Sequence, residues 1–166
     1  MAAARVAERV PERVPGMTLT NSARRLGSMV WFERRLFEVM GAWEPSTPTP
    51  AVKLVLARQS RRHGAHARAI EALLPETRDH DPAMLVATPD PGTPALVEEV
   101  QGRGDTGERL RGLVDELLPR HLEELEAFLA AASPVRDGPA IRALIFVLAE
   151  ERAELTDLEA LGASAP

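Results

Sequence analysis

The side chains most able to do chemistry in this sequence are histidines and acidic residues, because two other reactive types are missing. The 166 residues include four histidines and 25 aspartates and glutamates, but no cysteine and no tyrosine. The lack of cysteine excludes disulfides, thiolate metal sites, iron–sulfur clusters and cysteine nucleophiles. Imidazole, carboxylate, hydroxyl and guanidinium groups remain, with one lysine and two tryptophans. Imidazole and carboxylate groups act as general acids and bases or as metal ligands.

Several of these groups fall on helix faces that should be buried when each segment is placed on a helical wheel. Glu33, for example, stands in the middle of an apolar stripe, between Met29 and Met40. The polar residues with such inward positions are Glu33, Gln59, His63, His66, His121 and Glu151, and Glu124 and Glu154 lie beside the same faces. On each of the four segments one inward residue lies about a dozen residues from the nearest hairpin loop. We therefore expect these residues to share one layer of a helical bundle.

A buried layer of this composition needs partners for its charges. Burying even one unpaired carboxylate costs several kcal/mol. The pairs His63-x-x-His66 and Glu151-x-x-Glu154 have the i, i+3 spacing that places both side chains on one helical turn. A metal ion or a closed hydrogen-bond network would satisfy the layer, and four matched helices favour a metal or catalytic site.

The elements that must position this layer are separated by proline- and glycine-rich segments. Loops at 44–50 and 133–139 and a long irregular stretch at 75–106 leave four segments rich in Ala, Leu, Arg and Glu. The composition predicts an all-α protein with helices at about 20–43, 51–74, 107–132 and 140–162, after a flexible N-terminal arm over 1–18.

The loop lengths predict how these helices connect. The two short loops make two antiparallel hairpins, and the crossover at 75–106 is long enough to run the length of a bundle. The resulting four-helix bundle over 19–162 is the ferritin-like arrangement, with an up-down-up-down bundle as the alternative. PALVEEVQ at 94–101 predicts extra helical turns within the crossover, and Pro119 predicts a kink or break in the third helix.

On these residues the chain resembles the ferritin-like superfamily of carboxylate-bridged di-metal bundles. That family offers one Glu from each of two helices and a Glu-x-x-His pair from each of the other two. The resemblance implies that Glu33 is the lone carboxylate of the first helix, and that His121 or Glu124 is the ligand of the third. His63-x-x-His66 and Glu151-x-x-Glu154 would stand in the positions of the two pairs.

The sequence also departs from the family pattern. Glu-x-x-His is intact on neither helix, since His replaces Glu in one pair and Glu replaces His in the other. A layer richer in histidine suits zinc, copper, nickel or a single iron as readily as a di-iron centre. We therefore predict non-haem iron or another transition metal as the cofactor, with a metal-free site as the alternative.

The first functional hypothesis is a ferritin-like, metal-dependent oxidoreductase that acts with O₂ or peroxide on a small molecule. His63, His121 and Glu151 would be its catalytic groups, and Glu33, His63, His66, His121 and Glu151 its metal ligands, with Glu124, Glu154 and Gln59 as further candidates. The second is a metal-free protein of the same fold, which uses the layer for acid–base chemistry or as a structural network. Iron storage is the third.

Charge and hydropathy limit the kinds of molecule that the protein is expected to bind. The net charge of −5 argues against nucleic-acid and membrane-surface binding. No apolar run approaches the ~18 residues of a membrane span, and the N-terminus lacks the apolar core of a signal peptide. We therefore expect a cytoplasmic protein with a small-molecule substrate, which could also form a homodimer.

Overall fold

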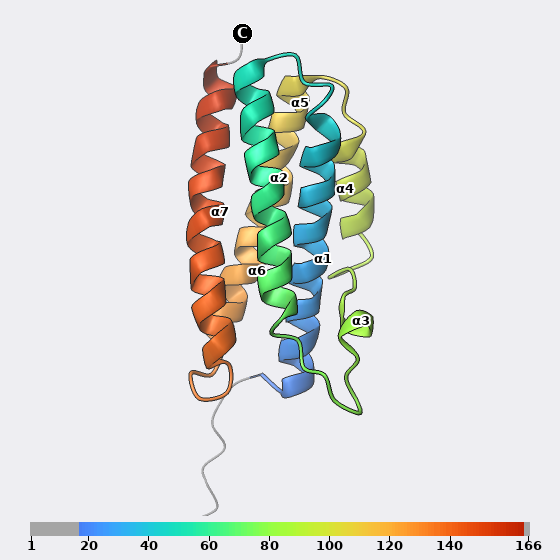
Figure 1. Cartoon of the computed structure of the whole chain (residues 1–166), viewed down its shortest axis with the longest axis vertical. Helices are drawn as coiled ribbons and strands as arrows, with labels where there is room; N and C mark the ends of the chain where they lie inside the picture. The colour runs from blue at the N-terminus through green and yellow to red at the C-terminus, as the bar shows by residue number, and fades with distance from the viewer. Residues whose placement is uncertain (1–16, 165–166) are drawn as a thin grey trace, which may run out of the picture.

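The computed structural model describes residues 17–164, and the regular structure in that range is helical (Figure 1). The prediction of an all-α protein is confirmed: residues 17–164 contain no strand, and their only β-type pairing is an isolated bridge between Thr77 and His80. The predicted N-terminal arm lies almost entirely outside the described residues.

Four long stretches of helix account for most of the chain, and they begin and end within three residues of the predicted ranges. They are α1 (Leu19–Trp43), α2 (Pro50–Glu71), the continuous run of α5 (Thr106–Arg111), η1 (Gly112–Leu117) and α6 (Leu118–Ala131), and α7 (Gly138–Ser164). Thr18 caps α1 through its hydroxyl, which accepts a hydrogen bond from the Asn21 amide, and Pro50 begins α2.

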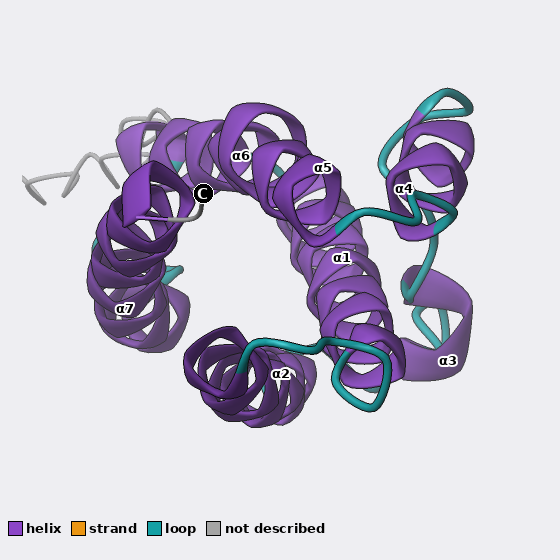
Figure 2. Cartoon of the chain, turned by 90° about the horizontal axis from the view of Figure 1, so that it is seen from above, coloured by secondary structure: helices purple, strands orange, loops and turns teal. Residues whose placement is uncertain are grey.

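The long helices pack side by side. Helix α1 contacts α2 and α6, and α7 contacts the same two helices. The colours of Figure 1 show that α1 and α7 run in one direction and that α2 and α5–α6 run in the opposite direction. Viewed along the helices, the four stretches surround a common interior (Figure 2). Side chains at the middle of each helix can therefore meet.

The crossover between α2 and α5 contains two short helices, α3 (Pro82–Leu85) and α4 (Thr93–Gln101). Helix α4 spans the segment predicted to form extra turns, and it packs on η1, whereas α3 packs on α1. The crossover thus covers the outer side of α1 and of the α5–α6 run.

The break predicted at Pro119 takes the form of a π-helical turn just before it. Proline has no N–H to donate and its ring crowds the carbonyl four residues earlier, so the α-helical ladder cannot continue unchanged. The Leu118 N–H instead donates to the Leu113 carbonyl, five residues back. The chain thereby passes Pro119 without leaving the helix, and His121 follows in α6.

The apolar core is divided into two clusters that lie on either side of the polar layer. One cluster includes Leu36, Leu56 and Leu158, and the other includes Val30 and Ile70. Each polar side chain at mid-helix is therefore bounded by apolar packing along its own helix. None of the helices formed by residues 17–164 combines the length and apolar character needed to span a bilayer.

Candidate metal centre

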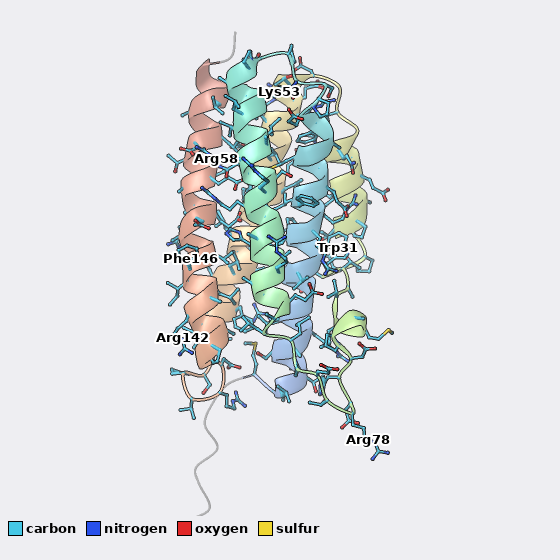
Figure 3. All side chains as sticks on the ribbon, viewed as in Figure 1. Trp31, Lys53, Arg58, Arg78, Arg142 and Phe146 are labelled. Atoms are coloured by element: carbon cyan, nitrogen blue, oxygen red, sulfur yellow. The ribbon has the colours of Figure 1, made fainter. Side chains whose placement is uncertain are left out.

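Four buried side chains from three helices converge at the middle of the molecule. Glu33 of α1, His63 and His66 of α2, and Glu151 of α7 each offer one ligand atom, and these atoms all lie within 4.8 Å of one another. None of the four residues is more than 4% exposed. The arrangement arises because α2 packs against both α1 and α7, and side chains fill the space between these helices (Figure 3).

His63 lies at the centre of the cluster and uses both ring nitrogens. Its Nδ1 is 2.7 Å from Glu33 Oε2 and 3.2 Å from Glu151 Oε1. Its Nε2 is 3.0 Å from Glu154 Oε1, on the opposite edge of the ring. One edge of the imidazole therefore faces the converging ligand atoms, and the other edge is held by a separate carboxylate.

His66, one turn further along α2, repeats this arrangement. Its Nδ1 lies 3.0 Å from Glu151 Oε1 and 3.4 Å from Glu33 Oε1, and its Nε2 lies 2.7 Å from Glu150 Oε2. Two histidines thus point Nδ1 into the same space, and adjacent turns of α7 provide the carboxylates, Glu150 and Glu154, that hold their Nε2 atoms. We call Glu150 and Glu154 the clamping carboxylates.

His121 approaches the cluster from α6. Its Nε2 is 3.0 Å from Glu33 Oε1, and its ring stacks on Phe32 at a centroid distance of 5.0 Å with an interplanar angle of 2°. The contact holds one oxygen of Glu33 while the other oxygen faces His63. His121 therefore orients a candidate ligand without itself belonging to the group of four converging residues.

The electrostatics of the cluster couple these residues strongly. Burial alone would raise the pKa of Glu33, but the charge of His121 and hydrogen bonds from the histidines outweigh it and hold that pKa well below its ordinary value. Burial would lower the pKa of His63, but Glu151 and Glu154 raise it well above its usual range. The pKa of His66 rises to about 10, because hydrogen bonds to Glu151 and Glu33 outweigh the effect of burial.

The carboxyls of α7 are shifted in opposite directions. The charge of His63 and hydrogen bonds from the histidines lower the pKa of Glu151 against the effect of its burial. Burial and the nearby charges of Glu151 and Glu33 raise the pKa of Glu154, although His63 lowers it. In the metal-free protein at neutral pH, two imidazolium groups therefore face two carboxylates.

Several buried polar atoms beside the cluster have no hydrogen-bond partner. They are Gln59 Nε2 and Oε1, Glu151 Oε2 and Glu154 Oε2. Glu33 and the two histidines of α2 have no such atoms. These unsatisfied groups, three acceptor oxygens and the Gln59 amide N–H donors, lie on α2 and α7, the two helices that supply most of the cluster.

The structure sorts the predicted site residues into groups. Glu33, His63, His66 and Glu151 come together; His121 and Glu154 lie next to them as hydrogen-bond partners; Gln59 is buried but unpaired. Glu124 does not join them, because α6 turns it toward Arg25, whose Nε lies 2.7 Å from its carboxylate. Its carboxylate, at the edge of an apolar face, forms an ion pair at the surface and lies outside the group of four converging residues.

The sequence reasoning missed Glu150. It precedes Glu151 and lies off the inward row of α7, with its side chain 31% exposed, yet it reaches His66 across the helix pair. The one signal for it in the sequence is chemical: a histidine that binds metal through one nitrogen needs a partner for the other.

Comparison of the chain with protein-family models, with curated proteins and with solved structures finds no match. The function therefore has to be inferred from the chemistry of the buried residues.

Proposed function

We propose that this protein binds one transition-metal ion through Glu33, His63, His66 and Glu151 and uses it to oxidise or reduce a small molecule. Two imidazole nitrogens and two carboxylates form a donor set of intermediate hardness that suits iron, manganese, copper or zinc. Redox exchange with a small oxidant such as O₂ or peroxide is the chemistry that iron or manganese supplies among such donors.

The observation that carries this proposal is the pair of clamping carboxylates. Metal-binding histidines almost always donate their second N–H to a carboxylate, a carbonyl or water, which fixes the ring and makes it a better ligand. Both His63 and His66 have this arrangement, with Nδ1 directed inward and Nε2 held at 3.0 and 2.7 Å. The unpartnered Oε2 of Glu151 adds a free lone pair beside the converging atoms.

The remaining residues have defined tasks in this proposal. His121 holds Glu33 Oε1 in place, and the apolar clusters on either side exclude water from the layer. Glu154 has a raised pKa and an Oε2 without a partner, so it can keep a proton at that oxygen and deliver it beside His63.

We further propose that the chain has the ferritin-like arrangement of four helices. Support comes from the opposite directions of α1 and α2, the shared direction of α2 and α6, and the crossover that returns along the molecule between them. In this fold, ligands project inward from facing helices, as the cluster residues do here.

A second candidate, a metal-free structural network, is favoured by one observation. Every ring nitrogen of His63 and His66 has a carboxylate partner within 3.0 Å, so the groups satisfy one another. The pKa shifts also balance two positive charges against two negative ones. In this alternative the layer fixes the register of the helices and the metal is absent.

Metal analysis of the purified protein separates the two candidates. Protein produced with iron, manganese, zinc and copper in the medium should contain about one equivalent of a transition metal, and Co²⁺ should give ligand-field bands when added to the stripped protein. His66→Gln should abolish both signals. His80→Gln is the matched control, since His80 hydrogen-bonds Thr20 and Thr77 outside the cluster.

The chelator response gives a second readout. Removal of the ion should lower the melting temperature, because a ligand bound only by the folded state stabilises it. Less than about a tenth of an equivalent of every metal, with a melting temperature that chelator does not change, would refute the metal site and favour the network.

A further inference from the structure

A groove runs along α1 beneath the crossover, and one end of it is lined by His121, a hydrogen-bond partner of the buried cluster. It consists of two adjoining cavities, of about 540 and 260 Å³, which share Ser28 and Pro89 in their walls. The smaller cavity is lined by Phe32 and His121, and His121 hydrogen-bonds Glu33. A larger cavity of about 810 Å³ between α5 and α7 has no cluster residue in its wall.

The outer wall of this groove is fixed by a very close approach of two backbones. A Cβ atom on Gly27 would lie 2.0 Å from the carbonyl oxygen of Leu85, so no side chain fits at this point. The crossover is therefore seated directly on α1. The segment that follows, which includes Thr88 and Pro89, forms part of the cavity wall.

Unpaired charges of both signs line the groove. In the part of the chain that the structure describes, Arg24 and Asp79 form no ion pair or side-chain hydrogen bond, although both lie in the wall of the 540 Å³ cavity. The neighbouring Arg25 is neutralised by Glu124, and Arg120 lies 3.7 Å from Asp90. The wall of the 540 Å³ cavity thus has one free cation and one free anion, which fits a ligand that carries both charges. Glu123, in the wall of the 260 Å³ cavity, also forms no ion pair or side-chain hydrogen bond among the described residues.

Apolar side chains complete the groove. Met84 and Leu85 contribute to the 540 Å³ cavity, and Met29 and Phe32 contribute to the 260 Å³ cavity. Eight residues along a helix span ~12 Å, so a small molecule that contacts both Arg24 and Phe32 requires the long Arg24 side chain to extend toward Ser28. A charged end at Arg24 would leave an apolar end directed at His121.

We propose that this groove binds a small zwitterion of the α-amino acid type, with its carboxylate on Arg24, its ammonium on Asp79 and its side chain toward Phe32 and His121. The inference deepens the proposed function by naming a substrate class. It rests on that function only for the chemistry near Glu33, because the binding itself depends on the groove alone.

The test is an NMR titration of the ¹⁵N-labelled protein with L-phenylalanine. Amide shifts should concentrate at Leu85, Thr88 and Ser28. Phenethylamine, which lacks the carboxylate, and 3-phenylpropanoate, which lacks the amine, should each bind about five- to tenfold more weakly. Equal binding of either analogue would overturn the zwitterion proposal, and so would shifts confined to Val114 and Leu158, which line the separate cavity of about 810 Å³.

Variants test the two charges separately. Arg24→Gln should weaken binding of L-phenylalanine about five- to tenfold but leave binding of phenethylamine unchanged. Asp79→Asn should weaken binding of L-phenylalanine to a similar extent but leave binding of 3-phenylpropanoate unchanged. Arg68→Gln is the control, since Arg68 is an exposed arginine of α2 away from the groove. All three positions are exposed, so the variants should fold; unchanged affinity in Arg24→Gln would refute the assignment.

The metal state distinguishes this proposal from the previous one. If the protein binds Mn²⁺ at the cluster, ring protons of bound L-phenylalanine should relax faster than its Cα proton, because the ring lies nearer the ion. If no metal binds but the titration succeeds, the groove is a ligand site and the redox function fails. If metal binds and L-phenylalanine does not, the groove assignment fails alone.

Discussion

Replacing Glu33 with glutamine should destabilise the metal-free protein strongly. The Glu33 carboxylate is fully buried and lies 2.7 Å from His63 Nδ1, 3.0 Å from His121 Nε2 and 3.4 Å from His66 Nδ1. Glutamine keeps the size of the side chain but removes the charge that balances the imidazolium groups. Losing one partner of a buried ion pair costs ~3–5 kcal/mol, and ~2–4 °C per kcal/mol for a domain of this size gives a fall in Tm of ~6–20 °C.

Urea denaturation in EDTA at pH 7, followed by circular dichroism, measures this change. Glu124→Gln is the control, because it breaks the ion pair with Arg25 at a side chain that is 37% exposed, and such pairs contribute ~1 kcal/mol or less. If the unfolding free energy of Glu33→Gln lies within ~1 kcal/mol of the control, the cluster holds no ionic network at Glu33 and the charge assignment is wrong.

Three further predictions concern the same layer. In the metal-free protein, His66 has a pKa of about 10 in the folded state against an ordinary value of 6.5, so its stabilising contribution is complete below pH 6.5 and is lost as the pH rises toward 10. The depressed pKa of Glu33 adds stability above its ordinary value of 4.5, and this stability is lost as the pH falls. The unfolding free energy should therefore peak between these limits, and a flat profile from pH 6.5 to 10 would contradict this prediction. Binding of Co²⁺ at neutral pH should release about two protons per ion, from His63 Nδ1 and His66 Nδ1, which calorimetry in buffers of different protonation enthalpy measures; no release would exclude these ligands. Gln59→Leu should be neutral or stabilising by thermal unfolding, because both polar atoms of the Gln59 amide are buried without partners; a loss of more than ~1 kcal/mol would show that the amide has a partner.

The inward positions could be predicted because helical periodicity alone decides which side of a helix faces its neighbours. Glu33, His63, His66 and Glu151 interrupt rows of apolar residues that bury them regardless of the details of packing. Their common depth also follows from the sequence, since residues at equal distances from a hairpin loop lie at equal heights. The predicted helix ends lie close to the observed ones because proline and glycine end helices through local backbone geometry.

The choice of partners could not be predicted, because it depends on how two helices are rotated relative to each other. Glu124 and Glu150 both lie beside an inward row, yet Glu124 pairs with Arg25 at the surface and Glu150 reaches His66. A small rotation of α6 or α7 would exchange these roles. The π-helical turn before Pro119 could not be predicted either. The proline indicates that the α-helical hydrogen-bond pattern is interrupted, but not which hydrogen bonds replace it.

The clamping carboxylates provide the sharpest distinction between a metal site and a structural network. Glu150→Ala removes the partner of His66 Nε2 and leaves the four converging ligands intact. The change leaves the buried Nε2 N–H of His66 without its partner, while Glu151 and Glu33 stay beside Nδ1, so the metal-free protein should lose ~1–3 kcal/mol. Loss of such an outer partner typically weakens metal binding ~10–100-fold. Co²⁺ titration should therefore show an unchanged stoichiometry with that loss of affinity.

The matched control for this variant lies on the same helix. Asp157→Ala breaks the exposed pair with Arg58, which lies between α2 and α7 on the surface (Figure 3), and should leave Co²⁺ affinity unchanged. A network has no such signature, since without a bound metal the variant could change only stability. If Glu150→Ala and Asp157→Ala bind Co²⁺ equally well, Glu150 does not orient His66 toward an ion. The resemblance of the cluster to a metal site would then rest on the convergence of its atoms alone, which a closed network of imidazolium and carboxylate groups produces equally well.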